Sequence, residues 1–220
     1  MRRLPVYLLL DTSGSMFGEP IQAVRVGIEA MVTSLRQDPF ALESVWLSII
    51  TFDRKVNLVC PLTEIESFQT PFIDAPESSP THLGEALELL MERVKVEVVR
   101  NGKDGKDAPS DWMPLLFIMT DGSPSDLKKF REMAPLVRRA GFGNIVACAA
   151  GSKAKEEYLR EITPNVICLD NTDSVTFQQF FRWVTSSVSV GNRTMGINAK
   201  LTPPPSEIFF SFAGKSFGEP

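Results

Sequence analysis

The stretch YLLLDTSGSM, residues 7–16, joins a short apolar run to an aspartate that is followed at once by small hydroxyl residues and a glycine. The apolar part predicts a strand that is buried on both faces. A strand that simply ends needs one turn residue, and Gly14 alone would serve. The carboxylate of Asp11 and the hydroxyls of Ser13 and Ser15 alternate along the chain. A tight turn at Gly14 would therefore aim these three oxygens at one point.

A second apolar run, PLLFIMT at residues 114–120, also ends at an aspartate, Asp121 in TDGSPSD. In open α/β sheets, sites form at the carboxyl ends of the strands, where the strand order reverses. Thr81, just before the predicted helix in SSPTHLGEAL, can supply a further oxygen from a helix N-terminus. Carboxylate and hydroxyl oxygens suit a hard divalent cation. We predict Mg²⁺ as the metal, with Mn²⁺ or Ca²⁺ as alternatives.

The rest of the sequence alternates helical patterns with wholly apolar strands. Strands are predicted at residues 5–10, 44–52, 55–60, 114–120, 144–151 and 165–170, and helices at 20–37, 83–99, about 125–139, 153–162 and 174–188. Only Asp53 and Arg54 separate the second and third strands, which requires an antiparallel hairpin. The predicted fold class is α/β, a doubly wound (Rossmann-like) and mostly parallel sheet with one antiparallel edge strand and helices on both faces.

Composition narrows the function classes. The 220 residues are 43% hydrophobic and carry a formal net charge of −4, which argues against nucleic acid as the main partner. The basic run KKFR, residues 128–131, is interpreted as a solvated helix face. No apolar stretch is long enough to predict a membrane span, and three scattered cysteines fit a reducing compartment. We expect a cytoplasmic protein.

The C-terminal tail differs from the rest of the chain. We expect one domain over residues 1–190, followed by a tail over residues 191–220 that is first Pro-rich and then aromatic. The segment IFFSF, residues 208–212, is too apolar to be a solvent-exposed linker that makes no contacts. It is interpreted as docking on a sheet edge of its own domain or reaching a partner, and the first interpretation is preferred.

With these motifs the sequence resembles the von Willebrand factor A domain. DTSGS matches the first part of the metal-ion-dependent adhesion site of that family, TDG matches its later aspartate motif, and Thr81 matches its middle threonine. The resemblance implies five metal ligands, namely Asp11, Ser13, Ser15, Thr81 and Asp121. The middle motif reads Ser-Pro-Thr where the family often has glycines, so Ser78 or Ser79 stays open as an alternative to Thr81.

The same resemblance carries an expected function. It implies a non-enzymatic interaction module in which the metal binds a glutamate or aspartate of a partner protein. The surrounding sequence is also similar to the bacterial TerY-type proteins of tellurium-resistance systems. The stretches that carry this similarity are RRLPVYLLLDTSGSMFGEPI, ITFD and PLTE. That similarity implies a stress-response scaffold beside a protein kinase and a PP2C-type phosphatase.

An enzymatic alternative uses Asp11 as the nucleophile of a magnesium-dependent phosphotransferase or phosphatase of haloacid-dehalogenase type. Such enzymes place a second aspartate two residues later as the general acid, and Ser13 stands there instead. His82, the single histidine, lies next to Thr81, but no GxSxG elbow supplies a serine nucleophile. We predict no catalytic residues.

Overall fold

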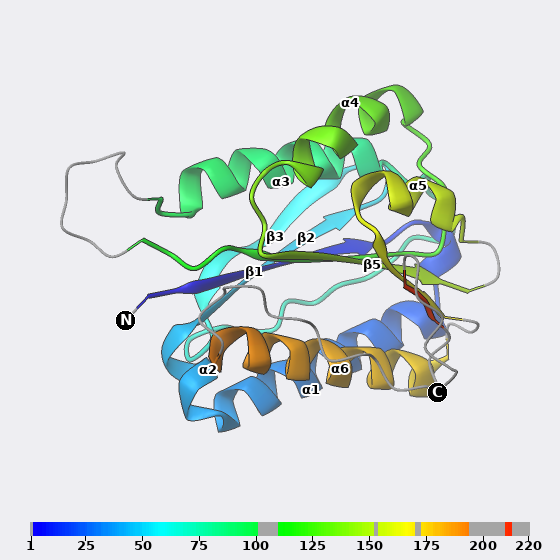
Figure 1. The fold of residues 1–220 in the computed structure, drawn as a ribbon. Helices are drawn as coiled ribbons and strands as arrows, with labels where there is room; N and C mark the ends of the chain where they lie inside the picture. Colours follow the sequence, from blue (N-terminus) through cyan, green and yellow to red (C-terminus); the bar gives the residue numbers. More distant parts are fainter. Residues whose placement is uncertain (1, 101–109, 152–153, 170–172, 194–209, 213–220) are drawn as a thin grey trace, which may run out of the picture.

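The fold is a three-layer α/β sandwich, seen in a computed structural model that describes residues 2–100, 110–151, 154–169, 173–193 and 210–212 (Figure 1). The strands are β1 (Leu4–Asp11), β2 (Val45–Phe52), β3 (Val56–Glu64), β4 (Leu115–Thr120), β5 (Asn144–Ala150), β6 (Asn165–Leu169) and β7 (Phe210–Phe212). The helices are α1 (Glu19–Gln37), α2 (Pro39–Ser44), α3 (Leu83–Glu97), α4 (Leu127–Arg138), α5 (Glu156–Ile162) and α6 (Ser174–Arg193), with a 3₁₀ turn at Gly14–Met16.

The sheet order is β3-β2-β1-β4-β5-β6-β7. Strands β2, β1, β4, β5 and β6 are parallel, while β3 and β7 pair antiparallel at the two edges. The chain moves from β1 outward to β2 and β3, and later from β4 outward in the other direction. The strand order therefore reverses between β1 and β4, and the carboxyl ends of these two strands flank the switch point.

Two apolar layers hold the helices to the sheet. Helices α1, α2 and α6 cover one face, and α3, α4 and α5 cover the other (Figure 1). Strand β1 is buried along its whole length, and its successive side chains enter opposite layers: Leu8 joins the α1–α6 side and Leu9 the α3–α4 side. This double burial explains why the central strands lack the polar alternation of a one-sided sheet.

The predicted fold class is confirmed, and three local features differ from the expectation. The break at Pro39 is real, but Asp38 accepts a hydrogen bond from the Phe40 amide and caps a further short helix, α2. Strand β3 is longer than predicted and pairs with β2 through register shifts. A second antiparallel strand, β7, lies at the other edge beside β6, where one antiparallel edge strand was predicted, and it agrees with the preferred interpretation that the aromatic segment docks on a sheet edge. None of the helices in the described residues is long and apolar enough to cross a membrane.

Candidate metal centre

The side chain of Asp11 is held at the end of β1 by two hydrogen bonds. Its Oδ1 accepts from the backbone amide of Ser13 at 2.8 Å, and its Oδ2 accepts from the hydroxyl of Thr120 at 2.5 Å. Asp11 is buried, as are Thr12 and Ser13. The local turn is anchored because the Thr12 amide donates to the Phe52 carbonyl at the end of β2. The carboxylate is thus fixed between neighbouring strand ends.

The end of β4 brings the second carboxylate to the same place. Leu10 pairs with Met119 across the sheet, so the next residues along, Asp11 and Thr120, lie side by side. The Ser15 hydroxyl donates to Oδ1 of Asp121 at 2.7 Å, and the hydroxyls of Ser13 and Ser15 are 3.3 Å apart. The structure therefore joins Asp11, Ser13, Ser15 and Asp121 in one cluster, with Ser15 exposed at its surface.

Thr81, in the loop before α3, lies against the loop that follows Asp121. It is buried, and its Oγ1 lies so close to Gly122 that a Cβ there would be 3.2 Å from it. Its backbone is fastened to the β4–α4 loop, because the Ser125 amide donates to the Thr81 carbonyl at 2.8 Å and the Thr81 amide donates to the Ser125 hydroxyl at 3.1 Å. The hydroxyl of Thr81 is therefore placed beside the residue that follows Asp121.

The two alternative serines of the middle motif have other contacts. The Ser79 hydroxyl accepts from the Arg54 amide at 3.0 Å, and its carbonyl accepts from the Gly14 amide at 3.2 Å. Ser78 is exposed, and its Cα would be 2.8 Å from a Cβ on Gly14. This close approach explains the glycine inside DTSGS, since any side chain there would push the 78–79 segment away. Thr81 lies beside the residue after Asp121, whereas Ser79 bonds to Arg54 and Ser78 is exposed, and the choice of Thr81 as the ligand stays a prediction.

Burial and like charge make Asp11 an unusual carboxylate. Loss of solvation raises its pKa to about 6, the hydrogen bonds from Ser13 and Thr120 oppose that rise, and the charge of Asp121 adds to it. No Lys, Arg or His in the described residues forms an ion pair with Asp11. Two converging carboxylates with this environment favour a bound cation, which would offset both charges.

The donor set fits a hard divalent cation. Two carboxylates and three hydroxyls offer oxygen only, the ligand type that Mg²⁺, Mn²⁺ and Ca²⁺ prefer. The nearby cysteines do not contribute, since Cys148 is buried within β5 and Cys168 donates to Glu156 beside α5. The residues present therefore fit a metal of the predicted class.

Two functional contacts were not anticipated from the sequence. Thr120 positions Asp11 directly, and the parallel register between β1 and β4 is the signal that would have placed it there. Asp126, at the start of α4, accepts from the amides of Gly84 and Glu85 at the start of α3. It therefore ties the loop that carries Thr81 to the loop that carries Asp121.

Comparisons with known proteins bear on the family and the fold. A family model described as the von Willebrand factor type A domain matches residues 6–183. No curated protein matches the sequence. Among solved structures, proximal thread matrix protein 1 from the mussel byssus is 16% identical, with a TM-score of 0.61 over 86% of this chain and 47% of that chain.

Further solved structures extend the likeness. A structure of the same mussel protein, described as having a zinc-occupied MIDAS motif, is 14% identical, with a TM-score of 0.57 over 86% of this chain and 48% of that chain. BatB from Bacteroides thetaiotaomicron is 16% identical, with a TM-score of 0.55 over 84% of this chain and 97% of that chain. The present chain spans about half the length of the mussel protein, and at these identities the likeness shows the fold.

Proposed function

Because the chain belongs to the von Willebrand factor type A domain family, we propose that it is a non-enzymatic, metal-dependent protein-interaction module. The observation that carries the proposal is the buried Asp11 carboxylate, which meets Asp121 through Ser13 and Ser15 at the switch point of the sheet. Such a cluster favours a cation, and its exposed member, Ser15, marks where the cluster opens to solvent.

Five residues would hold the metal: Asp11, Ser13, Ser15, Thr81 and Asp121. A divalent cation is supported by the oxygen donor set and by the zinc-occupied MIDAS motif of the mussel protein. We propose Mg²⁺ as the ion bound in this chain. When bound, it would supply an electrophilic coordination position to an incoming carboxylate. The chain itself fixes Asp11 through Thr120 and the Ser13 amide. It leaves Ser15 exposed to solvent, where a partner would approach.

The partner is proposed to offer a glutamate or aspartate to this position. The similarity of the sequence to TerY-type proteins supports a more specific role. In that role the chain is a bacterial, cytoplasmic scaffold that works beside a protein kinase and a PP2C-type phosphatase. Co-purification of a kinase or phosphatase with the tagged wild-type chain, and its loss with Asp11→Ala, would support this setting. Recovery of neither class of enzyme would contradict it.

The haloacid-dehalogenase alternative is not adopted. Ser13 occupies the position of the general acid, and its amide donates to the carboxylate that would act as nucleophile. Turnover of a generic phosphate ester with Mg²⁺ that disappears in Asp11→Ala would overturn this choice.

The direct test of the proposed function compares partner capture with Mg²⁺ and with EDTA. Tagged wild-type protein and Asp11→Ala are incubated with the same extract, and Thr33→Ala serves as a control because Thr33 is exposed on α1 and bonds only within its helix. We expect proteins that are captured with Mg²⁺ by the wild type and the control, and lost with EDTA or Asp11→Ala. Equal recovery in Mg²⁺ and EDTA would contradict a metal-dependent module.

A further inference from the structure

An exposed aromatic side chain borders the candidate metal centre and takes no part in the cluster. Phe17 follows Ser15, the exposed member of the cluster, by two residues, and it is 50% exposed, whereas Met16 between them is completely buried. Consecutive Cα atoms are about 3.8 Å apart, so those of Ser15 and Phe17 are at most about 7.6 Å apart. Phe17 therefore lies on the surface that a partner must approach to reach the metal.

The backbone holds Phe17 in this position from both sides. Its amide donates to the Gly14 carbonyl at 3.3 Å, and the Gly14 amide donates to the Ser79 carbonyl at 3.2 Å. Gly18 has a φ of 88°, a conformation that residues with a side chain rarely adopt, and α1 begins directly after it. The turn thus fixes the position of Phe17 relative to the predicted metal ligands.

A second exposed apolar side chain lies at the start of α6. Val175 is 64% exposed, and the hydroxyl of its neighbour Ser174 donates to Oε1 of Glu19 at 3.5 Å. This contact joins the first turn of α6 to the first turn of α1, and the two helices run side by side on one face of the sheet (Figure 1). We call Phe17 and Val175 the apolar rim of the metal centre.

The ring of Phe17 is left open by the part of the chain that the structure describes. No aromatic or cationic side chain in that part stacks on it. Phe72 is more exposed, but the Arg25 guanidinium lies 4.2 Å from the centre of its ring. Burial of the apolar rim against a partner would remove apolar surface from water, which stabilises a complex.

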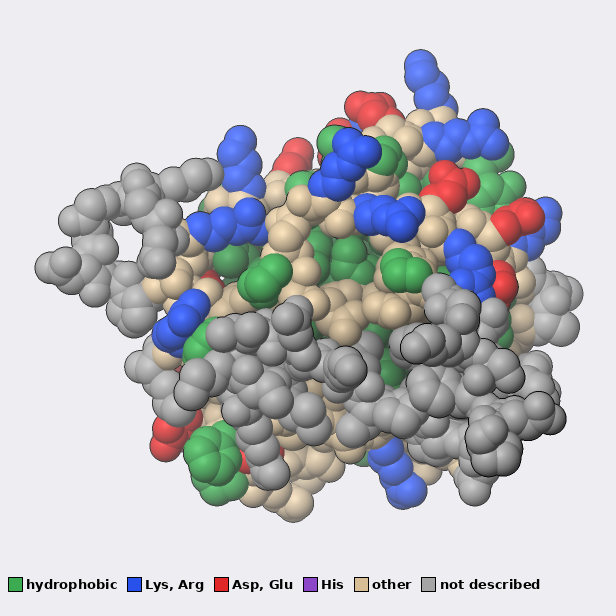
Figure 2. Space-filling view, in the orientation of Figure 1, with side chains coloured by type: hydrophobic (Ala, Val, Ile, Leu, Met, Phe, Trp, Pro, Cys, Tyr) green, Lys and Arg blue, Asp and Glu red, His purple; other side chains and the backbone are tan. Residues whose placement is uncertain are grey.

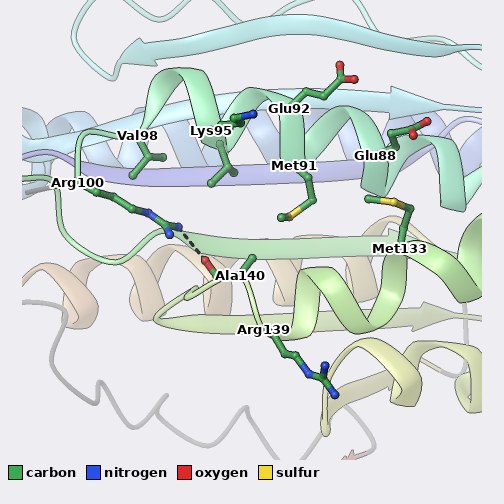
Figure 3. Close-up of a pocket in the computed structure, with 10 residues that line it drawn as sticks. Glu88, Met91, Glu92, Lys95, Val98, Arg100, Met133, Arg139 and Ala140 are labelled. Carbon is green, nitrogen blue, oxygen red and sulfur yellow. Dashed lines mark hydrogen bonds between the residues drawn. The ribbon is translucent and has the colours of Figure 1, made fainter. Parts of the chain in front are cut away.

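The face formed by α3, α4 and α5 shows no comparable preference for one kind of partner. In Figure 2, Lys and Arg side chains lie among Asp and Glu side chains over the upper part of the visible face, where Figure 1 places these helices. Figure 3 shows a pocket of about 490 Å³ between α3 and α4, and its lining includes Glu88 and Glu92 as well as Arg139. The apolar rim, in contrast, adjoins a site with one proposed ligand, a carboxylate.

We propose that the apolar rim belongs to the metal-dependent interface, and that the partner carries an apolar residue within three positions of the carboxylate that binds the metal. This inference rests on the proposed function, which supplies the carboxylate. An extended segment advances about 3.3 Å per residue, so one to three residues span the distance from the cluster to Phe17. The carboxylate holds the segment at the metal, and the apolar residue selects among acidic segments.

An apolar residue suits the rim better than a cationic one. Neither Phe17 nor Val175 carries a charge or a hydrogen-bonding group in its side chain, and burial against apolar atoms is what both can contribute. An exposed cation–π contact would involve Phe17 alone and contributes little. Glu19 could attract a lysine or arginine of the partner, and the peptide selection below distinguishes that occupant.

The test selects short peptides with one fixed central glutamate and random flanks on the full chain in Mg²⁺. The best peptide is labelled, and its affinity in Mg²⁺ and in EDTA is measured by fluorescence anisotropy for wild type, Phe17→Ala, Phe17→Leu and Phe40→Ala. Phe40 is the matched control, because it is 56% exposed and lies on α2, which leads into the amino end of β2. Calorimetry measures the Mg²⁺ affinity of each protein without peptide.

We expect enriched peptides with Leu, Ile, Val, Met or Phe within three positions of the glutamate. Phe17→Ala should weaken the best peptide about five- to tenfold, because part of the apolar contact is lost. Phe17→Leu should weaken it less, and Phe40→Ala should leave its affinity unchanged. The Mg²⁺ affinity should be the same in all four proteins, which separates loss of the contact from damage to the metal centre.

The possible failures are distinguishable. Peptides that bind equally in Mg²⁺ and EDTA, or a selection without any peptide, would overturn the proposed function and this inference with it. Mg²⁺-dependent peptides without an apolar preference, or with Lys or Arg in its place, would overturn this inference alone. Equal affinity of wild type and Phe17→Ala would do the same, and so would a loss of Mg²⁺ binding in Phe17→Ala that accounts for the loss of peptide binding.

Discussion

Asp11 is a buried carboxylate with a raised pKa, and this property predicts how the metal-free protein responds to pH. Its pKa is about 6 in the folded chain and 3.8 in its ordinary state, so the folded state binds the proton more tightly. The resulting stabilisation is complete below the ordinary pKa and is lost as pH rises to about 6. Above that pH the ionised carboxylate of Asp11, buried beside Asp121, lowers the free energy of unfolding.

We therefore expect Asp11→Asn to stabilise the metal-free protein near neutral pH by about 1–3 kcal/mol, from a shift of about two pKa units. The asparagine removes the charge and keeps an acceptor for the Ser13 amide. Urea unfolding in EDTA at neutral pH, and again near pH 4, measures the difference, which should narrow as the pH falls. A variant that is less stable than wild type at neutral pH would contradict this account of Asp11.

The hydroxyl of the middle motif gives a second prediction. Thr81→Ala should weaken Mg²⁺ binding about tenfold or more, since one oxygen of the set is lost, while Thr81→Ser should largely keep the affinity. Ser78→Ala is the matched control, because Ser78 is exposed and touches the cluster through its backbone near Gly14. Calorimetric titration measures all three, and a larger loss with Ser78→Ala than with Thr81→Ala would contradict the assignment.

At the residue scale, the chemistry of the side chains predicted which residues cluster, but not which residue holds Asp11 in position. Asp11, Ser13, Ser15 and Asp121 could be grouped because oxygen-bearing side chains stand at the ends of two apolar strands. Thr120 was missed as a positioning residue, since its role depends on the register of β1 with β4. Such register is set by packing between strands that are more than a hundred residues apart in the sequence, which no local pattern reports.

Among the secondary structure elements, the start of α3 depends on a side chain from another helix. Asp126 accepts from the Gly84 amide at 3.1 Å and from the Glu85 amide at 2.8 Å. We expect Asp126→Ala to lower the free energy of unfolding by about 1–2 kcal/mol, as loss of a helix cap does. Asp126→Asn keeps one acceptor and should lose less. Chemical unfolding compares the two, and equal losses would contradict a capping role.

Helices α1 and α6 approach closely at Gly27. A Cβ on Gly27 would lie 2.2 Å from Cδ2 of Phe181, which is buried. Gly27→Ala should therefore destabilise the domain by about 1–3 kcal/mol, despite the better helix propensity of alanine. The double variant Gly27→Ala with Phe181→Leu should recover part of that loss. If thermal unfolding showed Gly27→Ala to be as stable as wild type, the close approach of these helices would be wrong.

The elements also differ in how well the sequence predicted them. Long periodic helices such as α1 and wholly apolar strands such as β4 were predicted nearly to their ends, because burial dictates their pattern. Helix α2 was missed, since six residues that begin with a proline carry too few apolar positions to show a period. Docking of the aromatic segment on a sheet edge was the preferred prediction, and pairing of β7 with β6 agrees with it. The sequence could not name the edge strand, because this pairing is a contact between distant segments.

On the scale of the whole molecule, the sheet topology decides where the candidate metal centre lies. The strand order reverses between β1 and β4, and the carboxyl ends of these two parallel strands carry Asp11 and Asp121. The loop that carries Thr81 is tied to the same edge of the sheet through Ser125.

The central claim is that the Asp11 cluster binds a divalent metal, and thermal unfolding of wild type and Asp11→Ala with Mg²⁺ or EDTA tests it most directly. At one hundred times its dissociation constant, a bound ion should stabilise the fold by about 2.7 kcal/mol. For a chain of this size that raises the melting temperature by roughly 5–10 °C. We predict this rise in wild type and none in Asp11→Ala. No rise in wild type at saturating Mg²⁺, Mn²⁺ or Ca²⁺, or an equal rise in both proteins, would contradict the account.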